Sequence, residues 1–392
     1  MTSFGHQMRE YWLLDPEITY LNHGTVGATP RRVLAAQQAI RDEIERQPSR
    51  YLLRELVGLL KPPQPGPTRL RTAADVVANF MGAQGHDLVF VDNATTGVNA
   101  VLRSLSLQKS DEILITDLAY GAVAHVATFV AREHDARVNT VSMPYPVQNS
   151  DVFVNVIAKA LSPWTRIAII DHITSESALI MPLAKIAARC RQRGVPVLAD
   201  GAHAPGILPL DIPALGVDWY IANLHKWAYA PRSCGFLWAS PERQSTVHPP
   251  VISWGLDKGF TAEFDWVGTR DPSPYLAAPE GIAFMRDLGI EAVRSYNHNL
   301  AWEAAQMLSK RWGTTLGIPE AMVGSMVTLP LPERFGSTRE DAMRLRDALL
   351  FEDRIEAQMH ASRGRLWVRI SAQVYNEMAD YERLAAAVSA RA

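Results

Sequence analysis

The feature that most constrains the fold is a regular alternation of two patterns, which begins near Leu88. Short apolar runs rich in β-branched residues alternate with segments whose apolar residues recur at helical spacing. Such alternation is typical of parallel strands joined by crossover helices. The strand candidates are LVFVDN, EILITD, VNTVSM, IAIIDHIT and VPVLAD, and the helix candidates between them are GVNAVLRSL, GAVAHVATFVAREH, VFVNVIAKAL and PLAKIAARCRQRG. The sequence therefore predicts an α/β fold with a large, doubly wound, mainly parallel sheet.

The pattern changes near both ends of the chain. Past residue 275 helical patterns dominate, and two strand candidates, GSMVTLPLP and RLWVRISAQ, precede a final helix, YERLAAAVSA. We therefore expect three parts: an N-terminal segment, 1–30, that joins the small domain; a large domain, 31–274; and a smaller α+β C-terminal domain, 275–392.

A proline-rich stretch, KPPQPGPT at 61–68, separates two helical patterns, RRVLAAQQAIRDEIERQ and TAADVVANFMG. Four prolines and a glycine in eight positions exclude a regular element there. The composition suits an exposed surface connection and equally a mobile flap, so the role of this stretch stays open.

Charge and cysteine content exclude several classes of protein. The formal net charge is −2 over 392 residues, and no basic run stands beside interleaved aromatic residues, so nucleic acid is not an expected partner. The two cysteines, Cys190 and Cys234, are too few for a disulfide framework and lack metal-ligand spacing, so we expect no metal site. No export signal or membrane-length apolar run is visible. We expect a cytoplasmic protein without a membrane partner.

An acidic residue and a lysine stand where the chain leaves neighbouring strand candidates. The strand VPVLAD ends in Asp200, and Lys226 lies in the loop LHKWAYAPRS, between VDWYIAN and CGFLWAS. Open α/β sheets bind their ligands at such strand ends. A buried carboxylate there caps a turn or pairs with a cation, and a protonated pyridine nitrogen is such a cation. A lysine among apolar neighbours is either a surface lysine or, with its pKa lowered, an amine suited to imine formation.

A third segment, NATTGVNAVL, supplies a strand-to-helix turn. Thr95 and Thr96 open a helix whose first amides are unpaired, which suits a phosphate dianion as well as an ordinary helix cap. The chain contains no GxGxxG motif after a strand and no GxxxxGK[ST] motif, so dinucleotide and P-loop sites have no support. Acid, lysine and phosphate cradle together predict pyridoxal 5'-phosphate (PLP) as the cofactor.

With these segments in view, the chain resembles the class V aminotransferase family of fold-type I PLP enzymes, and within it the isopenicillin N epimerase-like branch. The resemblance runs from about Tyr20 to Tyr381. The segments that carry it are YLNHGTVGATP, NATTGVNAVL, DLAYGAV, HITSESALIMPL, ADGAHAPG, HKWAYAPRSCGFLW, VISWG, WVGTRDPSPYLA and VRISAQVYN. Each is weakly specific alone, and together in this order they are highly specific.

The resemblance implies a role for each matching position. Lys226 is the imine lysine, Asp200 holds the pyridine nitrogen, and Tyr120 stacks on the cofactor face. Thr95, Thr96, Asn223 and His225 match phosphate-binding positions, Ser175 and His203 match contacts to the phenolic oxygen, and Thr269 reaches the phosphate of a neighbouring subunit. The family therefore implies a homodimer with shared sites. Asn22, His23, Arg270 and Arg369 match substrate positions, with Arg369 fixing the α-carboxylate through a bidentate fork.

One departure bears on the reaction. Cysteine desulfurases of this family carry a nucleophilic cysteine on a loop before the arginine, and the corresponding stretch here, FEDRIEAQMHASRGR, has none. We expect an enzyme that removes the α-proton of an amino acid through Lys226, with epimerisation as the favoured outcome. A carbon–sulfur β-lyase of the cysteine desulfhydrase type and an aminotransferase stay open as alternatives, as does a PLP-binding protein without turnover.

Overall fold

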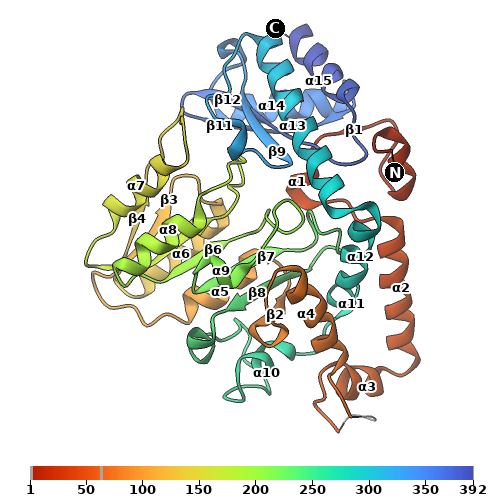
Figure 1. Cartoon of the computed structure of the whole chain (residues 1–392), viewed down its shortest axis with the longest axis vertical. Coiled ribbons are helices and arrows are strands. Elements are labelled where there is room, and N and C mark those ends of the chain that lie inside the picture. Colours follow the sequence, from red (N-terminus) through yellow and green to blue (C-terminus); the bar gives the residue numbers. More distant parts are fainter. Residues whose placement is uncertain (1–2, 62–64, 392) are drawn as a thin grey trace.

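The computed structural model describes residues 3–61 and 65–391. Its centre is a seven-stranded sheet with the strand order β2-β8-β7-β6-β5-β3-β4 (Figure 1). The strands are β2 (Leu88–Val91), β3 (Glu112–Thr116), β4 (Arg137–Val141), β5 (Thr165–Asp171), β6 (Val197–Asp200), β7 (Trp219–Asn223) and β8 (Gly235–Ala239). The five strand candidates of the alternating region are all present, which confirms the predicted α/β class.

The direction of the strands confirms a mainly parallel sheet. Neighbours from β7 through β6, β5 and β3 to β4 pair in parallel. Strand β8 pairs antiparallel with both β7 and β2 and is thus the one reversed strand of this sheet in the described part of the chain. Parallel strands end at one edge, so Asp171 and Asp200, which pair in register, lie side by side there.

Helices cover both faces of the sheet, because successive side chains of each strand point to opposite sides. Ile169 packs in one core with helices α5 and α6, and Ile170 packs in the other with α7 and α8. The crossover helices are α5 (Ala94–Arg103), α6 (Gly121–Glu133), α7 (Asp151–Ala160), α8 (Leu183–Gln192) and the short α9 (Ile212–Leu215). This is the doubly wound arrangement that the sequence predicts.

The proline-rich stretch separates two long helices. They are α2 (Arg31–Arg46) and α4 (Arg69–Phe80), and shorter helices elsewhere in this part are α1 (His23–Val26), α3 (Pro48–Arg50), α10 (Phe260–Asp265) and α11 (Ser273–Leu276). Thr68 begins α4 by accepting a hydrogen bond from the backbone of Arg71. Lys61 and residues 65–68 form no helix or strand, as expected, and residues 62–64 lie outside the described residues.

A second sheet lies near the C-terminus, with the strand order β11-β12-β9. Its strands are β9 (Met326–Pro330), β11 (Gln358–Ser362) and β12 (Arg365–Ser371), accompanied by α12 (Ala278–Leu288), α13 (Ile290–Trp312), α14 (Arg339–Phe351) and α15 (Met378–Ala390). Strands β11 and β12 form a hairpin that the sequence analysis missed. Its two-residue turn, Arg363 and Gly364, has positive φ at both positions, which matches the right-handed twist of the strands.

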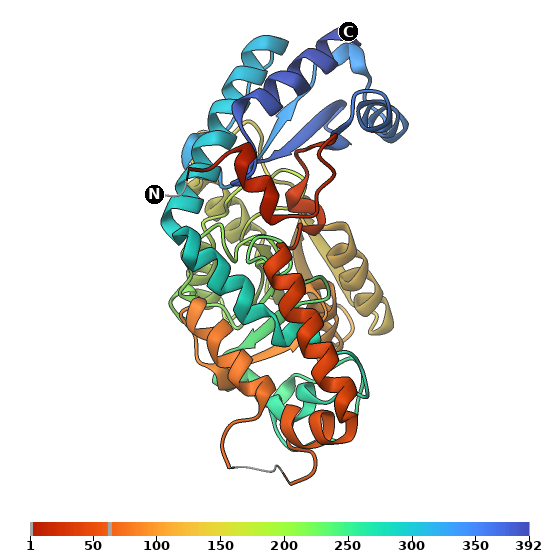
Figure 2. The same ribbon diagram turned by 90° about the vertical axis from the view of Figure 1, so that its right-hand side faces the viewer.

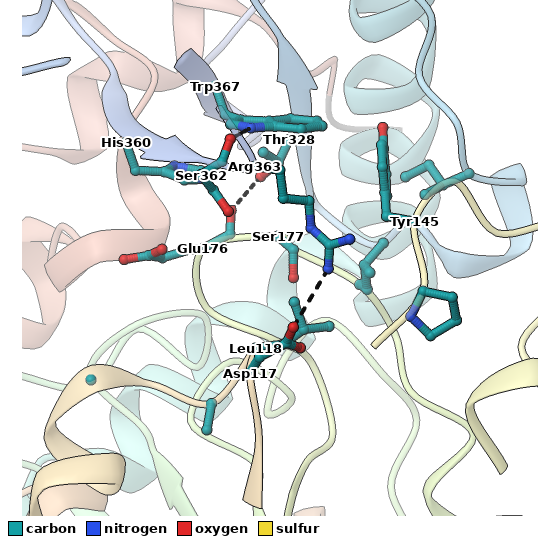
Figure 3. Close-up of a pocket in the computed structure, with 15 residues that line it drawn as sticks. Asp117, Leu118, Tyr145, Glu176, Ser177, Thr328, His360, Ser362, Arg363 and Trp367 are labelled. Carbon is teal, nitrogen blue, oxygen red and sulfur yellow. Dashed lines mark hydrogen bonds and ion pairs between the residues drawn. The ribbon is translucent and has the colours of Figure 1, made fainter. Parts of the chain in front are cut away.

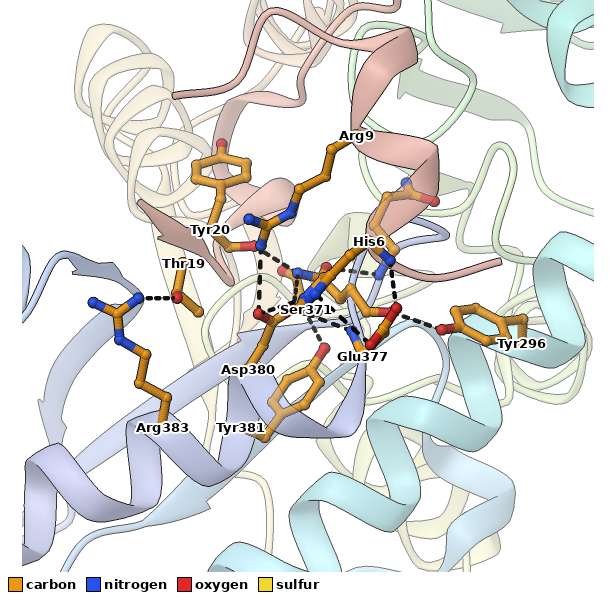
Figure 4. A network of polar contacts seen from close by, with 12 residues as sticks. His6, Arg9, Thr19, Tyr20, Tyr296, Ser371, Glu377, Asp380, Tyr381 and Arg383 are labelled. Atoms are coloured by element: carbon orange, nitrogen blue, oxygen red, sulfur yellow. Dashed lines mark hydrogen bonds and ion pairs between the residues drawn. The ribbon is translucent and has the colours of Figure 1, made fainter. Parts of the chain in front are cut away.

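The N-terminal segment contacts the C-terminal part of the chain (Figures 2 and 4). Strand β1 (Thr19–Tyr20) pairs in parallel with β10 (Ile355–Glu356). The His6 ring lies 2.9 Å from the Asp380 carboxylate, and Arg9 reaches the same carboxylate at 3.4 Å. These contacts agree with the expected docking of residues 1–30, while the domain boundaries themselves stay a prediction. None of the described helices has the length and apolarity needed to cross a membrane.

Candidate active site

The largest group of predicted site residues meets at a cavity of about 470 Å³ at the carboxyl edge of the seven-stranded sheet, which we call the central cavity. Loops after β2, β3, β5, β6 and β7 contribute to it, because parallel strands deliver their following loops to the same edge. The predicted residues that line it are Thr95, Thr96, Tyr120, Ser175, Asp200, His203, Asn223, His225 and Lys226.

Lys226 lies in the loop between β7 and β8, as predicted, and its amine faces His203. The Nζ atom is 3.2 Å from Nε2 of His203. Nδ1 of His203 accepts a hydrogen bond from the indole N–H of Trp227 at 3.4 Å, and an indole can only donate. The Trp227 contact therefore assigns the His203 proton to Nε2, the nitrogen that faces the lysine.

Burial lowers the pKa of both Lys226 and His203. It lowers the pKa of Lys226 to about 7, with a smaller contribution from Arg369 and an opposing one from Asp200. Burial also holds the pKa of His203 well below its usual range, and the charge of Lys226 adds to this effect. A large part of the Lys226 population therefore carries a free amine near neutral pH, which is the form that attacks carbonyl carbons.

Two carboxylates stand together at the strand ends. Asp200 is buried and accepts a hydrogen bond from the backbone of Ala202 at 2.9 Å. In the described part of the chain, no arginine or lysine lies within ion-pair distance of it. Burial raises the pKa of Asp200, opposed by Ala202 and Lys226, and burial together with the Asp200 charge raises the pKa of Asp171 well above its ordinary value. A cation bound beside Asp200 would reverse this shift.

The start of helix α5 forms one end of the central cavity. Asn93 caps the helix through its side-chain oxygen, which accepts from the backbone of Thr96 at 3.0 Å. The side-chain oxygen of Asn223 accepts a hydrogen bond from the backbone N–H of Ala94 at 2.8 Å. The NH2 group of Asn223 is therefore the part of this side chain that can donate near the same helix end. Nδ1 of His225 donates to the carbonyl of Cys234 at 2.9 Å. This end of the cavity therefore concentrates hydrogen-bond donors at a positive helix terminus.

Arg369 is a buried cation beside the central cavity. It lies on β12, and its guanidinium donates to the carbonyl of Ser175 and to the hydroxyl of Thr25, both at 2.7 Å. Its Nε is buried without a partner among the described residues. Burial lowers the pKa of Arg369 to about 10, and the charge of Glu176 opposes this effect. The group still carries its charge at neutral pH and lacks a hydrogen-bonded carboxylate, so the arrangement favours an anionic ligand.

The remaining predicted residues lie outside the lining of the central cavity. Both ring nitrogens of His23 are engaged, since Nε2 donates to the Lys226 carbonyl and Nδ1 faces the Tyr375 hydroxyl, each at 2.8 Å. Through this hydrogen bond His23 holds the backbone of Lys226 in place. The Asn22 side-chain oxygen lies 3.4 Å from the Arg369 guanidinium. Thr269 is exposed, and Arg270 pairs with Asp92 at 3.1 Å.

Three residues at the site were missed by the sequence analysis. Asp171 and Thr25 line the central cavity, and Trp227 sets the tautomer of His203. Asp171 had a readable signal, because IAIIDHIT delivers it to a strand end as VPVLAD delivers Asp200. Thr25 and Trp227 gave no comparable signal, because their roles depend on contacts with distant segments.

Neither of the two cysteines has the surroundings of a reactive thiol. Both are free thiols, and burial raises the pKa of Cys190 to about 12 and that of Cys234 well above its usual value. A nucleophilic cysteine needs a lowered pKa and access to the substrate. The stretch before Arg369 that lacks a cysteine folds into β10 and the β11–β12 hairpin.

Comparison with known proteins decides the family. The family described as Aminotransferase class-V matches residues 66–384, which is most of the chain. The chain belongs to this family. It is 32% identical to an isopenicillin N epimerase of Streptomyces clavuligerus over 98% of this chain and 97% of that one, and 32% identical to an L-cysteine desulfhydrase of Arabidopsis thaliana over 95% and 87%. An apo cysteine desulfurase of Thermococcus onnurineus shares the fold, with a TM-score of 0.80, 18% identity, and coverage of 100% and 98%.

Membership confirms the predicted family, fold type and cofactor, and the protein is a PLP-dependent enzyme. The buried residues fit the group: Asp200 lacks a side-chain cation among the described residues, and the α5 terminus offers donors for a phosphate. The relatives include an epimerase and desulfhydrases at similar identity, so the family alone leaves the reaction open.

Proposed function

We propose that the enzyme removes the α-proton of an amino-acid substrate with Lys226 and returns a proton to the opposite face, so that the substrate is epimerised. The observation that carries the proposal is a cavity lined by a lysine with a lowered pKa and a buried carboxylate, with a buried arginine hydrogen-bonded to two residues of its lining, Ser175 and Thr25. Each has the chemistry that one part of the cofactor–substrate pair requires.

The proposal assigns the cofactor contacts as follows. Lys226 would bind the cofactor covalently, Asp200 would hold its ring nitrogen, and Tyr120 would lie against the ring. The start of α5 would hold the phosphate through Thr95 and Thr96, together with Asn223 and His225, and Ser175 and His203 would contact the phenolic oxygen. The proton on Nε2 of His203, set by Trp227, supports a donating role toward an oxygen.

Arg369 binds the substrate α-carboxylate in this proposal. Its guanidinium is anchored by the carbonyl of Ser175 and the hydroxyl of Thr25, neither of which neutralises its charge. The buried Nε has no hydrogen-bond partner among the described residues, so the guanidinium is not saturated by the protein. A fixed, planar fork selects a carboxylate by geometry as well as by charge, and it orients the bond to the α-hydrogen toward the base.

Bound PLP supplies an electron sink for the carbon from which the proton leaves. Lys226 acts as the base, and a pKa of about 7 lets the same amine accept and return a proton near neutral pH. The Nε2–H of His203, 3.2 Å from Nζ, holds the amine in place. Inversion needs a second proton donor, and Tyr120 is the one exposed titratable side chain among the described residues that line the central cavity.

The protein acts as a homodimer with shared sites in this proposal. Thr269 is exposed and does not line the central cavity of its own subunit, which agrees with a contact to the phosphate site of a second copy. An exposed apolar segment nearby in the sequence includes Val251, Ile252 and Trp254, and such a surface suits burial against another subunit.

A second candidate is a carbon–sulfur β-lyase. The L-cysteine desulfhydrases of Arabidopsis thaliana and related plant proteins match the chain as well as the epimerases do. The buried, poorly acidic thiols of Cys190 and Cys234 agree with an elimination that leaves no sulfur on the enzyme. Both candidates share the same α-proton step.

Proton NMR of the substrate in heavy water, with wild type and Tyr120→Phe, separates the two. An epimerase forms the opposite isomer, and Tyr120→Phe suppresses inversion while Lys226 still exchanges the α-hydrogen. Full inversion by the variant excludes Tyr120 as the second donor. Pyruvate or sulfide released from a β-substituted substrate without inversion contradicts epimerisation and supports the lyase.

A further inference from the structure

A second cavity, which we call the outer cavity, is lined by residues next in sequence to those of the central one. Figure 3 shows the residues that line it. It measures about 160 Å³, and its lining includes Asp117, Tyr145, Ser177, Thr328, Arg363 and Trp367. A space of this size holds roughly one six-membered ring or a short chain of similar bulk. The α-carbon chemistry described above makes no use of it.

The two cavities share walls. Ser175 lines the central cavity and the next residue, Glu176, lines the outer one. In the same way Tyr120 lines the central cavity and Ala119 the outer one. The backbone segments 119–120 and 175–176 therefore each contribute to both cavities.

One face of the C-terminal sheet connects the substrate arginine with the outer cavity. Trp367 and Arg369 are two residues apart on β12, so their side chains lie on the same face. Thr328 on β9 is the register partner of Arg369, and His360 on β11 is the partner of Trp367. Thr328, His360 and Trp367 all line the outer cavity. The α-carboxylate of a substrate bound by Arg369 would therefore lie beside the outer cavity.

We propose that the outer cavity binds the far end of an extended substrate side chain, and that this end carries a carboxylate held by Arg363. The inference rests on the proposed function, since it extends the substrate that Arg369 and Lys226 position. The side chain of cysteine ends at its first heavy atom beyond Cβ and would leave the outer cavity unfilled. The preferred substrate is therefore an amino acid with a long acidic side chain.

Arg363 is the one lysine or arginine among the described residues that line the outer cavity. The hairpin turn fixes its backbone, and its guanidinium lies over the Tyr145 ring, 5.8 Å from the ring centre. The guanidinium donates from one Nη to the Met143 carbonyl at 2.7 Å, and the same Nη forms a long ion pair with Asp117 at 3.7 Å. Figure 3 shows the guanidinium between Tyr145 and Ser177, with its ion pair to Asp117 on one side.

Arg363 forms one long ion pair with a carboxylate that lines the outer cavity, without a hydrogen bond between them. This carboxylate, of Asp117, lies 3.7 Å away, beyond hydrogen-bond length, and accepts instead from Ser142 at 3.0 Å and from the backbone of Met143 at 2.9 Å. The exposed Glu176 side chain points away from the guanidinium (Figure 3). Arg363 therefore keeps donors free for an incoming carboxylate.

The test is α-hydrogen exchange of the holoenzyme in heavy water, which reports substrate engagement whatever product follows. The probes are L-alanine, L-norleucine and two ω-carboxyl amino acids, L-2-aminoadipate and L-2-aminopimelate. We expect kcat/KM for exchange to be highest for an ω-carboxyl substrate. Arg363→Gln lowers that value by about tenfold to hundredfold, as expected for a lost charge-assisted hydrogen bond, and leaves L-alanine unchanged.

Two further variants complete the design. Arg344→Gln is the matched control, because Arg344 is an exposed arginine on α14 whose partner is Asp341, and it should alter none of the probes. Gly121→Leu adds bulk at another residue that lines the outer cavity, and a Cβ there meets no atom within 4 Å, so the substitution is sterically tolerated. It should weaken L-norleucine and the ω-carboxyl substrates while sparing L-alanine.

The outcomes distinguish the inference from the function on which it rests. Exchange that favours L-alanine, or that ignores both Arg363→Gln and Gly121→Leu, overturns the outer-cavity inference and leaves the proposed function intact. If no probe and no other amino acid exchanges its α-hydrogen, the proposed function fails and the inference with it.

Discussion

Replacing Asp200 with asparagine separates its role toward the cofactor from its role in folding. The substitution keeps the shape of the side chain and the acceptor for the Ala202 backbone, and it removes one charge. Because the carboxylate is buried and pairs with no side-chain cation in the described part of the chain, its desolvation is uncompensated in the cofactor-free protein. We therefore expect the cofactor-free Asp200→Asn variant to unfold at the same temperature as wild type or higher.

The sign of this effect follows from the pKa of Asp200. Burial raises it in the fold, so the folded state binds the proton more tightly than the unfolded chain does. The contribution of Asp200 to cofactor-free stability is therefore present below the unfolded pKa and falls as pH rises through the folded pKa. Asp200→Asn should flatten this part of the stability profile.

With PLP bound, Asp200→Asn should be harmful, because the carboxylate then has a cationic partner to lose. Breaking a buried charge pair costs about 3–5 kcal/mol, and at about 1.4 kcal/mol per decade this lowers kcat by roughly a hundredfold to a few thousandfold. PLP affinity should fall as well. The assays are thermal unfolding without PLP, spectroscopic PLP titration and α-hydrogen exchange. A variant with near-normal exchange and unchanged PLP affinity would refute the assignment of Asp200.

Three further predictions test other parts of the site. The rate at which PLP attaches to cofactor-free protein should rise with pH with a midpoint near 7, following Lys226, and level off about one to two pH units above it; a rise with its midpoint near the usual lysine pKa would contradict the lowered pKa. Arg369→Lys should raise KM by about tenfold or more without releasing PLP, because a point charge cannot replace the fork; PLP loss would instead place Arg369 at the phosphate. Gly201→Ala should destabilise the protein by about 1–3 kcal/mol in thermal unfolding, since its Cβ would clash with the buried Tyr220 ring, and unchanged stability would show that the ring can move.

The sequence predicted those parts of the site that depend on local pattern. Asp200 and Lys226 follow recognisable strands, and a parallel sheet brings its strand ends to one edge, so their meeting at the central cavity could be expected. The five strands and four crossover helices of the alternating region were readable for the same reason. The reversed direction of β8 carries no such signal, because a buried strand reads alike in both directions.

Other features depend on contacts that no local pattern contains. The tautomer of His203 depends on Trp227, and the backbone position of Lys226 depends on His23, whose own ring is held by Tyr375. The β11–β12 hairpin had a local signal in its Arg-Gly turn at 363–364, but its place beside the central cavity comes from pairing with β9. The outer cavity combines turns from distant parts of the chain and could not be inferred before they were placed together.

The measurement that tests the central claim most directly is borohydride reduction of the PLP-loaded protein followed by peptide mapping. Only a lysine that carries the cofactor through a carbon–nitrogen double bond becomes permanently labelled. Our account predicts one labelled lysine, Lys226, with loss of α-hydrogen exchange in proportion to labelling, and no label in Lys226→Ala. Labelling of a different lysine, or full exchange activity in Lys226→Ala, would contradict it.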